Sequence, residues 1–159
     1  MEMKVLRVGG VVVAILITIC ASIAFAQADP HNGTWVLNTA QSKYSPGPVP
    51  KNQTTVYTVT AQGIKMSSTL TNATGTQHTE FSANFDGKDV AVKGNADYDM
   101  TNAKRVNANT IEFTRKKGGK VVQTATSVVA ADGKTRTVTT TGVNAAGQKI
   151  NNVGVYAKK

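Results

Sequence analysis

Hydrophobic and polar residues alternate along most of the chain beyond Asn32. In 64–71, for example, Ile64, Met66 and Leu70 are separated by polar residues. A period of two residues is the pattern of a β-strand with one buried face, because successive side chains point to opposite sides. No window has the period of about 3.6 residues that an amphipathic helix requires. The pattern therefore predicts an all-β fold.

Turn-forming residues divide this pattern into about ten short strands. Asp86-Gly87 is a typical hairpin turn, because both residue types tolerate positive φ. Strands joined by hairpins favour an antiparallel up-and-down meander of about eight to ten strands. Pairing the last strand with the first would close the meander into a β-barrel and remove two exposed edges. The predicted strands are 32–38, 54–60, 64–71, 77–85, 88–92, 98–106, 110–116, 120–130, 134–141 and 148–158.

The segment 39–50 interrupts the strand pattern after the first strand. It contains Pro46, Pro48 and Pro50, and proline fixes φ and lacks the backbone N–H donor. We expect neither a strand nor a helix there. The prediction is a stiff Pro-rich connector that crosses one end of the domain or forms a lid over it.

The N-terminal stretch has the three parts of a secretory signal peptide. Lys4 and Arg7 precede an apolar run over 8–24, and Ala24-Phe25-Ala26 places small residues at the positions that signal peptidase reads. We therefore predict a signal peptide over 1–26. The alternative is an uncleaved membrane anchor, since the apolar run nearly reaches the ~20 residues that span a bilayer.

Cleavage after Ala26 would leave a single domain over 27–159, located in the periplasm or secreted. This domain would contact a membrane only through the signal segment before its removal. It has no cysteine, because Cys20 lies in the signal. The domain must therefore be stable without disulfides, and a metal site built from cysteine is excluded. We predict no cofactor and no bound metal.

The charge of the chain is strongly positive. The whole chain has 18 Lys and Arg against 9 Asp and Glu, a formal net charge of +9. Because the signal holds Lys4, Arg7 and Glu2, the remaining domain has 16 against 8, or +8. Such a charge attracts anionic surfaces, such as phospholipid head groups or polysaccharide. Export makes nucleic acid an unsuitable partner.

Both ends of the predicted domain resemble a known family. Gly33-Thr34-Trp35-x-Leu37 resembles the Gly-x-Trp opening strand of lipocalins and fatty-acid-binding proteins, the calycin barrels. Val153-Gly154-Val155-Tyr156-Ala157-Lys158 is similar to the last strand of the fatty-acid-binding group. The domain as a whole looks like a small secreted bacterial lipocalin-like protein. The resemblance implies a lipocalin-like β-barrel with Trp35 at one end.

The chain departs from the family pattern in two places. Calycins usually carry an arginine near the end of the barrel that packs on the tryptophan. The last strand here has Asn151 and Asn152 but no arginine, so we expect this partner to be missing. The helical lid of fatty-acid-binding proteins is replaced by the Pro-rich connector. The resemblance therefore implies a fold but no specific ligand.

Our first functional hypothesis is a non-catalytic barrel that binds a small apolar or amphipathic molecule in its lumen. A barrel of about eight strands can enclose one small ligand. The candidates for lining the lumen are Trp35, Leu37, Ile64, Met66, Leu70, Phe81, Phe85, Ile111, Phe113 and Tyr156.

The second hypothesis is a cell-envelope interaction or structural protein that binds an anionic surface through its basic charge. Arg115-Lys116-Lys117 with Lys120 forms a basic hairpin tip that could dock an anionic lipid or polymer. The alternative interpretation of this tip is solubility and protection against edge pairing.

The third hypothesis is a hydrolase built on His78 and Glu80, which share one face of a strand. A histidine beside a carboxylate can act as an oriented general base. The alternative is a solvated polar face. The other histidine, His31, falls where we expect a frayed start of the domain. No nucleophile elbow, phosphate loop or catalytic triad is recognisable.

Two further polar groups have two interpretations each. Asp97-Tyr98-Asp99 places two carboxylates on one side of a tyrosine, which suits Ca²⁺ or acid–base chemistry, or an ordinary loop. The face with Thr135, Thr137, Thr139 and Thr141 could line a wet cavity or form a half-exposed β surface.

Overall fold

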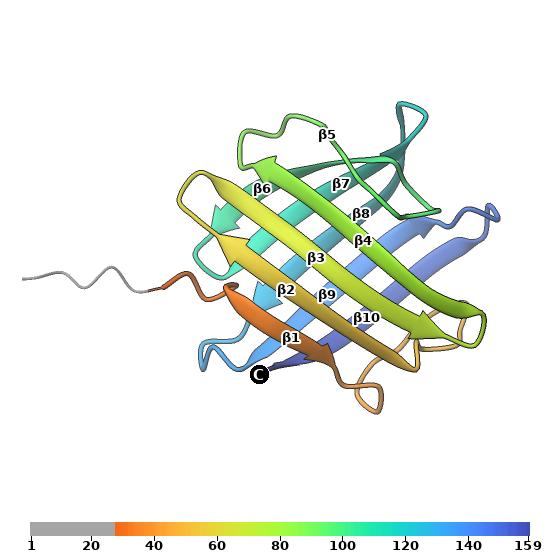
Figure 1. Cartoon of the computed structure of the whole chain (residues 1–159), viewed down its shortest axis with the longest axis horizontal. Coiled ribbons are helices and arrows are strands. Elements are labelled where there is room, and N and C mark those ends of the chain that lie inside the picture. The colour runs from red at the N-terminus through yellow and green to blue at the C-terminus, as the bar shows by residue number, and fades with distance from the viewer. Residues whose placement is uncertain (1–27) are drawn as a thin grey trace, which may run out of the picture.

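The computed structural model describes residues 28–159, which form ten antiparallel strands (Figure 1). The predicted signal peptide and its cleavage site after Ala26 lie outside the described residues. No helix long and apolar enough to cross a bilayer occurs within 28–159. The strands are β1 (Gly33–Leu37), β2 (Asn52–Val59), β3 (Gly63–Asn72), β4 (Gly75–Asn84), β5 (Val90–Ala91), β6 (Met100–Asn107), β7 (Thr110–Lys117), β8 (Lys120–Val129), β9 (Thr135–Val143) and β10 (Lys149–Lys158).

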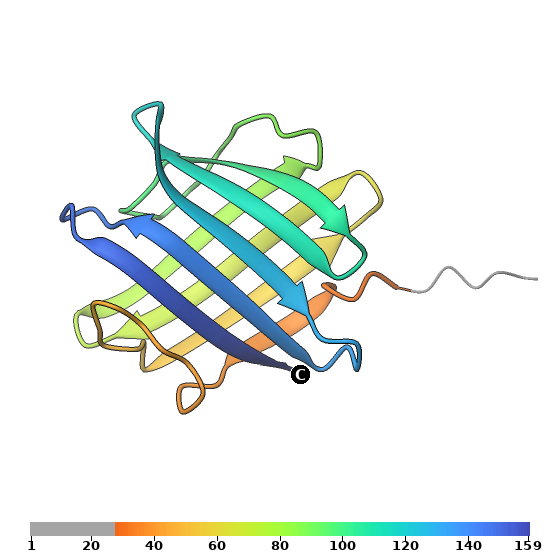
Figure 2. The same cartoon turned by 180° about the vertical axis from the view of Figure 1, so that it is seen from behind.

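The strands follow one another around a single curved sheet, as Figures 1 and 2 show from opposite sides. The spatial order is β4-β3-β2-β1-β10-β9-β8-β7-β6-β5. The last strand pairs with the first, with Trp35 opposite Lys158 and Leu37 opposite Tyr156, which confirms the predicted meander. The protein is thus an all-antiparallel, nearly closed barrel, consistent with a lipocalin- or calycin-like barrel.

The open edges of the sheet are β4 and β5, and a short bridge joins β4 to Lys93, two residues beyond β5. The backbone N–H of Glu80 donates to Lys93 O (3.1 Å), and that of Lys93 donates to Glu80 O (2.9 Å). We predicted a strand over 88–92, but β5 has only two residues, and Asp89 immediately before it accepts from the Lys116 side chain (2.6 Å). This shortening leaves the barrel incompletely closed.

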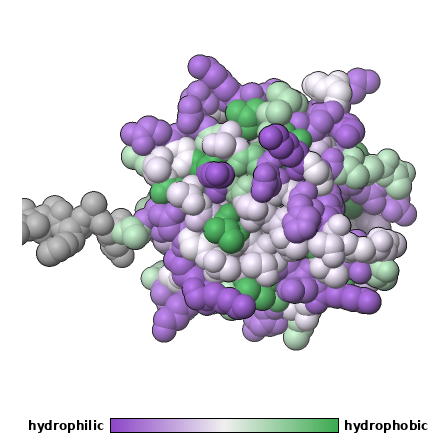
Figure 3. Space-filling model, in the orientation of Figure 1, coloured by the Kyte–Doolittle hydropathy of each residue, from purple (hydrophilic) through white to green (hydrophobic). Residues whose placement is uncertain are grey.

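Two hydrophobic clusters fill much of the interior. In the first cluster, the rings of Phe81 and Phe113 pack edge to face, with their centres 5.9 Å apart. The second cluster surrounds Trp35, whose side chain is fully buried. Hydrophobic spots on the outer wall are small and separate in the view of Figure 3. The first cluster contains Val59, Ile64, Met66, Phe81, Ala83, Ala103, Ile111, Phe113 and Ala125, and the second contains Trp35, Leu37, Val129 and Tyr156.

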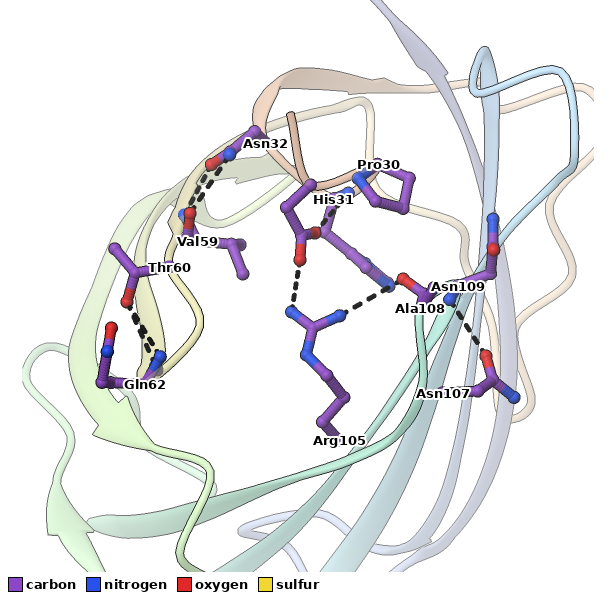
Figure 4. A network of polar contacts seen from close by, with 12 residues as sticks. Pro30, His31, Asn32, Val59, Thr60, Gln62, Arg105, Asn107, Ala108 and Asn109 are labelled. Atoms are coloured by element: carbon purple, nitrogen blue, oxygen red, sulfur yellow. Dashed lines mark hydrogen bonds and ion pairs between the residues drawn. The ribbon is translucent and has the colours of Figure 1, made fainter. Parts of the chain in front are cut away.

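The segment 29–32 covers one end of the barrel and is held from several strands (Figure 4). The Arg105 guanidinium pairs with Asp29, and the Asn32 side chain exchanges two hydrogen bonds with the backbone of Val59. The Trp35 indole donates to His31 O (2.9 Å). These contacts hold 29–32 in place at the end of the barrel next to Trp35.

The Pro-rich connector over 39–50 runs beside β10. Lys43 bridges to Val153, and the backbone N–H of Asn151 donates to Ser45 O (2.8 Å). Val49 packs against the Trp35 cluster. The connector therefore extends the β1–β10 edge beyond the end of β1.

Candidate functional site

In strand β9, the side chains of Arg136 and Thr140 point into the barrel, and those of Thr135, Thr137, Thr139 and Thr141 lie on the opposite face. Arg136 and Thr140 are buried, whereas Thr139 and Thr141 are exposed. The alternation follows from the period of two residues in a strand. The threonine face is therefore an outer surface and does not line a wet cavity.

The buried Arg136 lies among three aromatic rings. Its guanidinium carbon is 4.5 Å from the ring centres of both Tyr57 and Tyr156, and 5.3 Å from that of Trp35. Tyr156 is directly opposite Arg136 in the β9–β10 register, so the two side chains share a face. A Cβ on Gly154 would lie 2.8 Å from the Tyr156 ring, which explains the glycine in this strand.

This placement corrects our expectation that the tryptophan has no arginine partner. The last strand has Asn151 and Asn152 and no arginine. Arg136 comes instead from β9, the neighbouring strand, and reaches Trp35 across Tyr156. Cation–π contacts of this kind contribute about 0.5–2 kcal/mol each.

The guanidinium of Arg136 has no counterion within the described part of the chain. Its Nε and Nη1 atoms are buried and have no hydrogen-bond partner there. The three ion pairs of residues 28–159 involve Arg105, Lys88 and Lys116 instead. An uncompensated buried charge costs about several kcal/mol. The aromatic rings offset part of this cost, and an anion beside Arg136 would offset more.

A cavity of about 90 Å³ lies beside Arg136 in the lumen. Arg136 is 1% exposed, while Gln53, Leu70 and Gln77 at the other end of the cavity are half-buried, so the mouth lies at their end. The cavity lining consists of Gln53, Thr55, Tyr57, Met66, Ser68, Leu70, Gln77, Thr79, Asn95, Tyr98, Arg115, Arg136, Val138 and Tyr156.

Hydrogen bonds connect the polar groups of the lining. The Tyr156 hydroxyl donates to Gln53 Oε1 (2.9 Å), the Gln53 amide donates to Ser68 Oγ (3.1 Å), and the hydroxyls of Thr55 and Ser68 are 3.0 Å apart. Burial raises the pKa of Tyr156 well above its usual value of 10 and also raises that of Tyr98. Both phenols therefore keep their protons and remain donors.

A second arginine, Arg115, also faces the cavity. It lies 4.7 Å from the ring centre of Tyr98 and donates to Gln123 Oε1 (3.0 Å). Our prediction that Arg115 belongs to an exposed basic tip is therefore wrong. Arg115 has the same parity in β7 as the buried Ile111 and Phe113, so its side chain points inward. Lys117 remains exposed at the turn.

The structure places the predicted lumen residues mostly in packed clusters. Among them, Met66, Leu70 and Tyr156 border the cavity. Phe85 packs against the first cluster, and the remaining candidates Trp35, Leu37, Ile64, Phe81, Ile111 and Phe113 are buried members of the two clusters. The lining found here is more polar than the predicted one, because the sequence did not indicate which polar faces turn inward.

The pair His78 and Glu80 lies on the outer wall. Both side chains are exposed, and their hydrogen bonds go to Thr69 (2.9 Å) and Ser67 (3.4 Å). Neither residue lines a described cavity. Their exposed position on the outer wall counts against the hydrolase hypothesis, which requires both side chains to turn into a concave pocket.

The carboxylates of Asp97 and Asp99 hold loops together. Asp97 accepts from the backbone N–H of Ala145 (2.8 Å), and Asp99 accepts from that of Gly118 (3.1 Å). Within residues 28–159, no three His, Cys, Asp or Glu side chains gather in a way that could hold a metal ion. The loop interpretation accounts for the observed contacts.

His31 is fully buried, contrary to the expected frayed start, beneath an open basin of about 1080 Å³ at the end covered by 29–32. Burial lowers the pKa of His31 to about 4, although the Asp29 carboxylate opposes this shift. Both ring nitrogens lack a hydrogen-bond partner within the described residues. Figure 4 shows the ring directed toward Ala108 and Asn109.

No known protein-family profile matches the chain, and no similar sequence was found among curated proteins.

Proposed function

We propose that this protein is a non-catalytic, lipocalin-like binding barrel whose lumen holds a small anionic molecule against Arg136. The observation that carries the proposal is the buried guanidinium, which has unpartnered Nε and Nη1 atoms and borders a cavity. Buried charges in proteins are normally paired. A carboxylate or another oxyanion would accept charge-assisted hydrogen bonds from the unpartnered N–H groups of the guanidinium.

The size of the cavity argues for a short ligand. Its volume of about 90 Å³ is smaller than the ~150 Å³ cavity that accommodates benzene. It is also well below the ~300–1,000 Å³ of typical drug-sized pockets. A ligand of about six non-hydrogen atoms is therefore the upper size, because the apolar clusters fill the rest of the lumen.

The lining supports binding over catalysis. It contains hydroxyls, amides and two guanidinium groups, and none of the described lining residues is His, Cys, Asp or Glu. Those four side chains include the commonest general bases, and a serine or threonine hydroxyl needs such a base beside it to act as a nucleophile. The groups present at the cavity are suited to hold an anion in place.

The test is an acetate titration followed by the fluorescence of Trp35, the only tryptophan, which lies 5.3 Å from the Arg136 guanidinium. Acetate should change the emission saturably, and acetamide should not. Arg136→Met should weaken binding by at least about tenfold, since hydrogen bonds to charged groups contribute about 1.5–3 kcal/mol. Lys120→Met, at an exposed lysine, is the matched control. An unchanged acetate response in Arg136→Met would refute the proposal.

We further propose that residues 1–26 direct export to the periplasm or the exterior, as the charged start, apolar run and Ala-x-Ala site support. N-terminal sequencing of the protein from its host should begin at Gln27. Intact Met1 on the exported protein would contradict cleavage and favour the anchored alternative.

A second candidate function, contact with an anionic envelope surface, is favoured by the exposed lysines at the mouth end of the barrel. Lys51, Lys117, Lys120 and Lys149 lie where β2, β8 and β10 begin and β7 ends, which is one end of the meander. Binding to anionic vesicles that disappears at high salt would support this role, because exposed charges are screened. Binding independent of salt would count against it.

A further inference from the structure

We propose that the anion held in this cavity is a short hydroxylated carboxylate, and not an alkyl acid or an amino acid. This inference rests on the proposed function, because it identifies the chemical class of the molecule bound at Arg136. It is argued from the chemistry of the cavity wall, the charges around it and its volume.

The wall of the cavity is rich in small hydrogen-bonding groups. Among the lining residues, only Met66, Leu70 and Val138 have wholly apolar side chains. Hydrocarbon placed against the remaining wall would cover polar groups without replacing their hydrogen bonds, which is unfavourable. The polar groups other than the arginines and tyrosines are the hydroxyls of Thr55, Ser68 and Thr79 and the amides of Gln53, Gln77 and Asn95.

The hydroxyl groups can exchange partners with a ligand. Thr55 Oγ1 and Ser68 Oγ are 3.0 Å apart, and either can be the donor. Thr79 Oγ1 accepts from the Asn95 amide at 3.2 Å and keeps its own proton to donate. A ligand hydroxyl both donates and accepts. It can therefore bond to a wall hydroxyl that acts as donor or as acceptor, without leaving a group of the wall unpaired.

The charges of the cavity exclude an ammonium group. Arg115 and Arg136 both line it, and none of the residues of 28–159 that line it is Asp or Glu. An amino acid would bring its carboxylate to an arginine but leave its ammonium in a positive, partly desolvated site without a counterion. A hydroxy acid has the same carboxylate and no cationic group.

Four probes of one size separate these classes: lactate, isobutyrate, lactamide and alanine. All four have the same number of non-hydrogen atoms, and each fits the size limit set by the cavity of about 90 Å³. Isobutyrate replaces the hydroxyl of lactate by a methyl group, lactamide removes the negative charge, and alanine replaces the hydroxyl by an ammonium. Differences in affinity therefore report chemistry and not volume.

Calorimetric titration of the exported protein should give a saturable signal with lactate. Isobutyrate should bind about tenfold more weakly, the loss expected when a buried hydrogen bond is removed. Lactamide and alanine should give no measurable binding. Ser68→Ala should reduce the preference for lactate over isobutyrate, because Ser68 is buried at the cavity. Ser67→Ala is the matched control, since Ser67 is the exposed neighbour in the same strand.

Isobutyrate binding as tightly as lactate would overturn the inference, while the proposed function would stand. Tight binding of alanine would overturn the argument from the charges. If neither acid binds to the native protein, the proposed function itself fails. The wild-type comparison alone decides among these outcomes, so the result does not depend on the folding of the Ser68 variant.

Discussion

Acidification should weaken the fold through one residue, His31. Its ring is fully buried, and burial lowers its pKa from 6.5 to about 4. The folded protein therefore keeps His31 neutral at a pH where the unfolded chain binds a proton. Because the unfolded state then binds more protons, the stability contribution is complete above pH 6.5 and decreases as the pH falls from 6.5 to about 4.

The size of the effect follows from the two pKa values. A shift from 6.5 to about 4 corresponds to about 3 kcal/mol in total, at about 1.4 kcal/mol per unit. Between pH 7.5 and pH 5 the free energy of unfolding should fall by about 2 kcal/mol from this residue alone. For a domain of this length, that change corresponds to a decrease in Tm of roughly 6–10 °C.

Urea unfolding at pH 7.5 and pH 5 measures this change. His31→Phe removes the titrating group and keeps a buried ring, so its stability should depend less on pH by about 2 kcal/mol than that of the native protein. His78→Gln removes the exposed histidine and serves as the control. If His31→Phe retains the full pH dependence, or if His78→Gln abolishes it, our reasoning about the buried ring is wrong.

Two further substitutions test the packing of the barrel. A Cβ on Gly94 would lie 1.9 Å from His78 O, whereas Gly87 has similar φ and open surroundings; Gly94→Ala should therefore cost about 1–3 kcal/mol more than Gly87→Ala in urea unfolding, and equal costs would contradict the contact. Ser127 Oγ is buried without a partner in the described residues; Ser127→Ala should raise the free energy of unfolding by about 1 kcal/mol, and a clear loss would show that the hydroxyl is paired.

The alternation of residues was sufficient to predict the strands and their meander. The pairing of β10 with β1 followed from closing the sheet. The hairpin predicted at Asp86-Gly87 is wrong, because this turn separates β4 from β5, the two edges of the sheet that do not pair with each other within residues 28–159. The gap between β4 and β5 was not predictable, because the alternation of residues identifies single strands and does not determine which edges of the sheet pair.

The burial of Arg136 in the candidate site could not be predicted from the sequence, for a physical reason. The period of two residues divides β9 into a threonine face and an Arg136 face, but hydrophobicity would place an arginine outside. Contact with Tyr57, Trp35 and Tyr156 offsets part of the cost of its burial, and those residues lie on other strands. The inward orientation of the Arg115 side chain was predictable, because Arg115 lies on the same face of β7 as Phe113.

The most direct test of the lumenal anion site uses the two methionines of residues 28–159, Met66 and Met100. Met66 lines the cavity and Met100 does not. In a spectrum of protein labelled with ¹³C at the methionine methyl groups, lactate should shift the Met66 signal saturably and leave Met100 in place. The same titration of Arg136→Leu, which adds no methionine signal, should move neither signal. Equal movement of both signals, or an unchanged Met66 response in Arg136→Leu, would contradict binding beside Arg136.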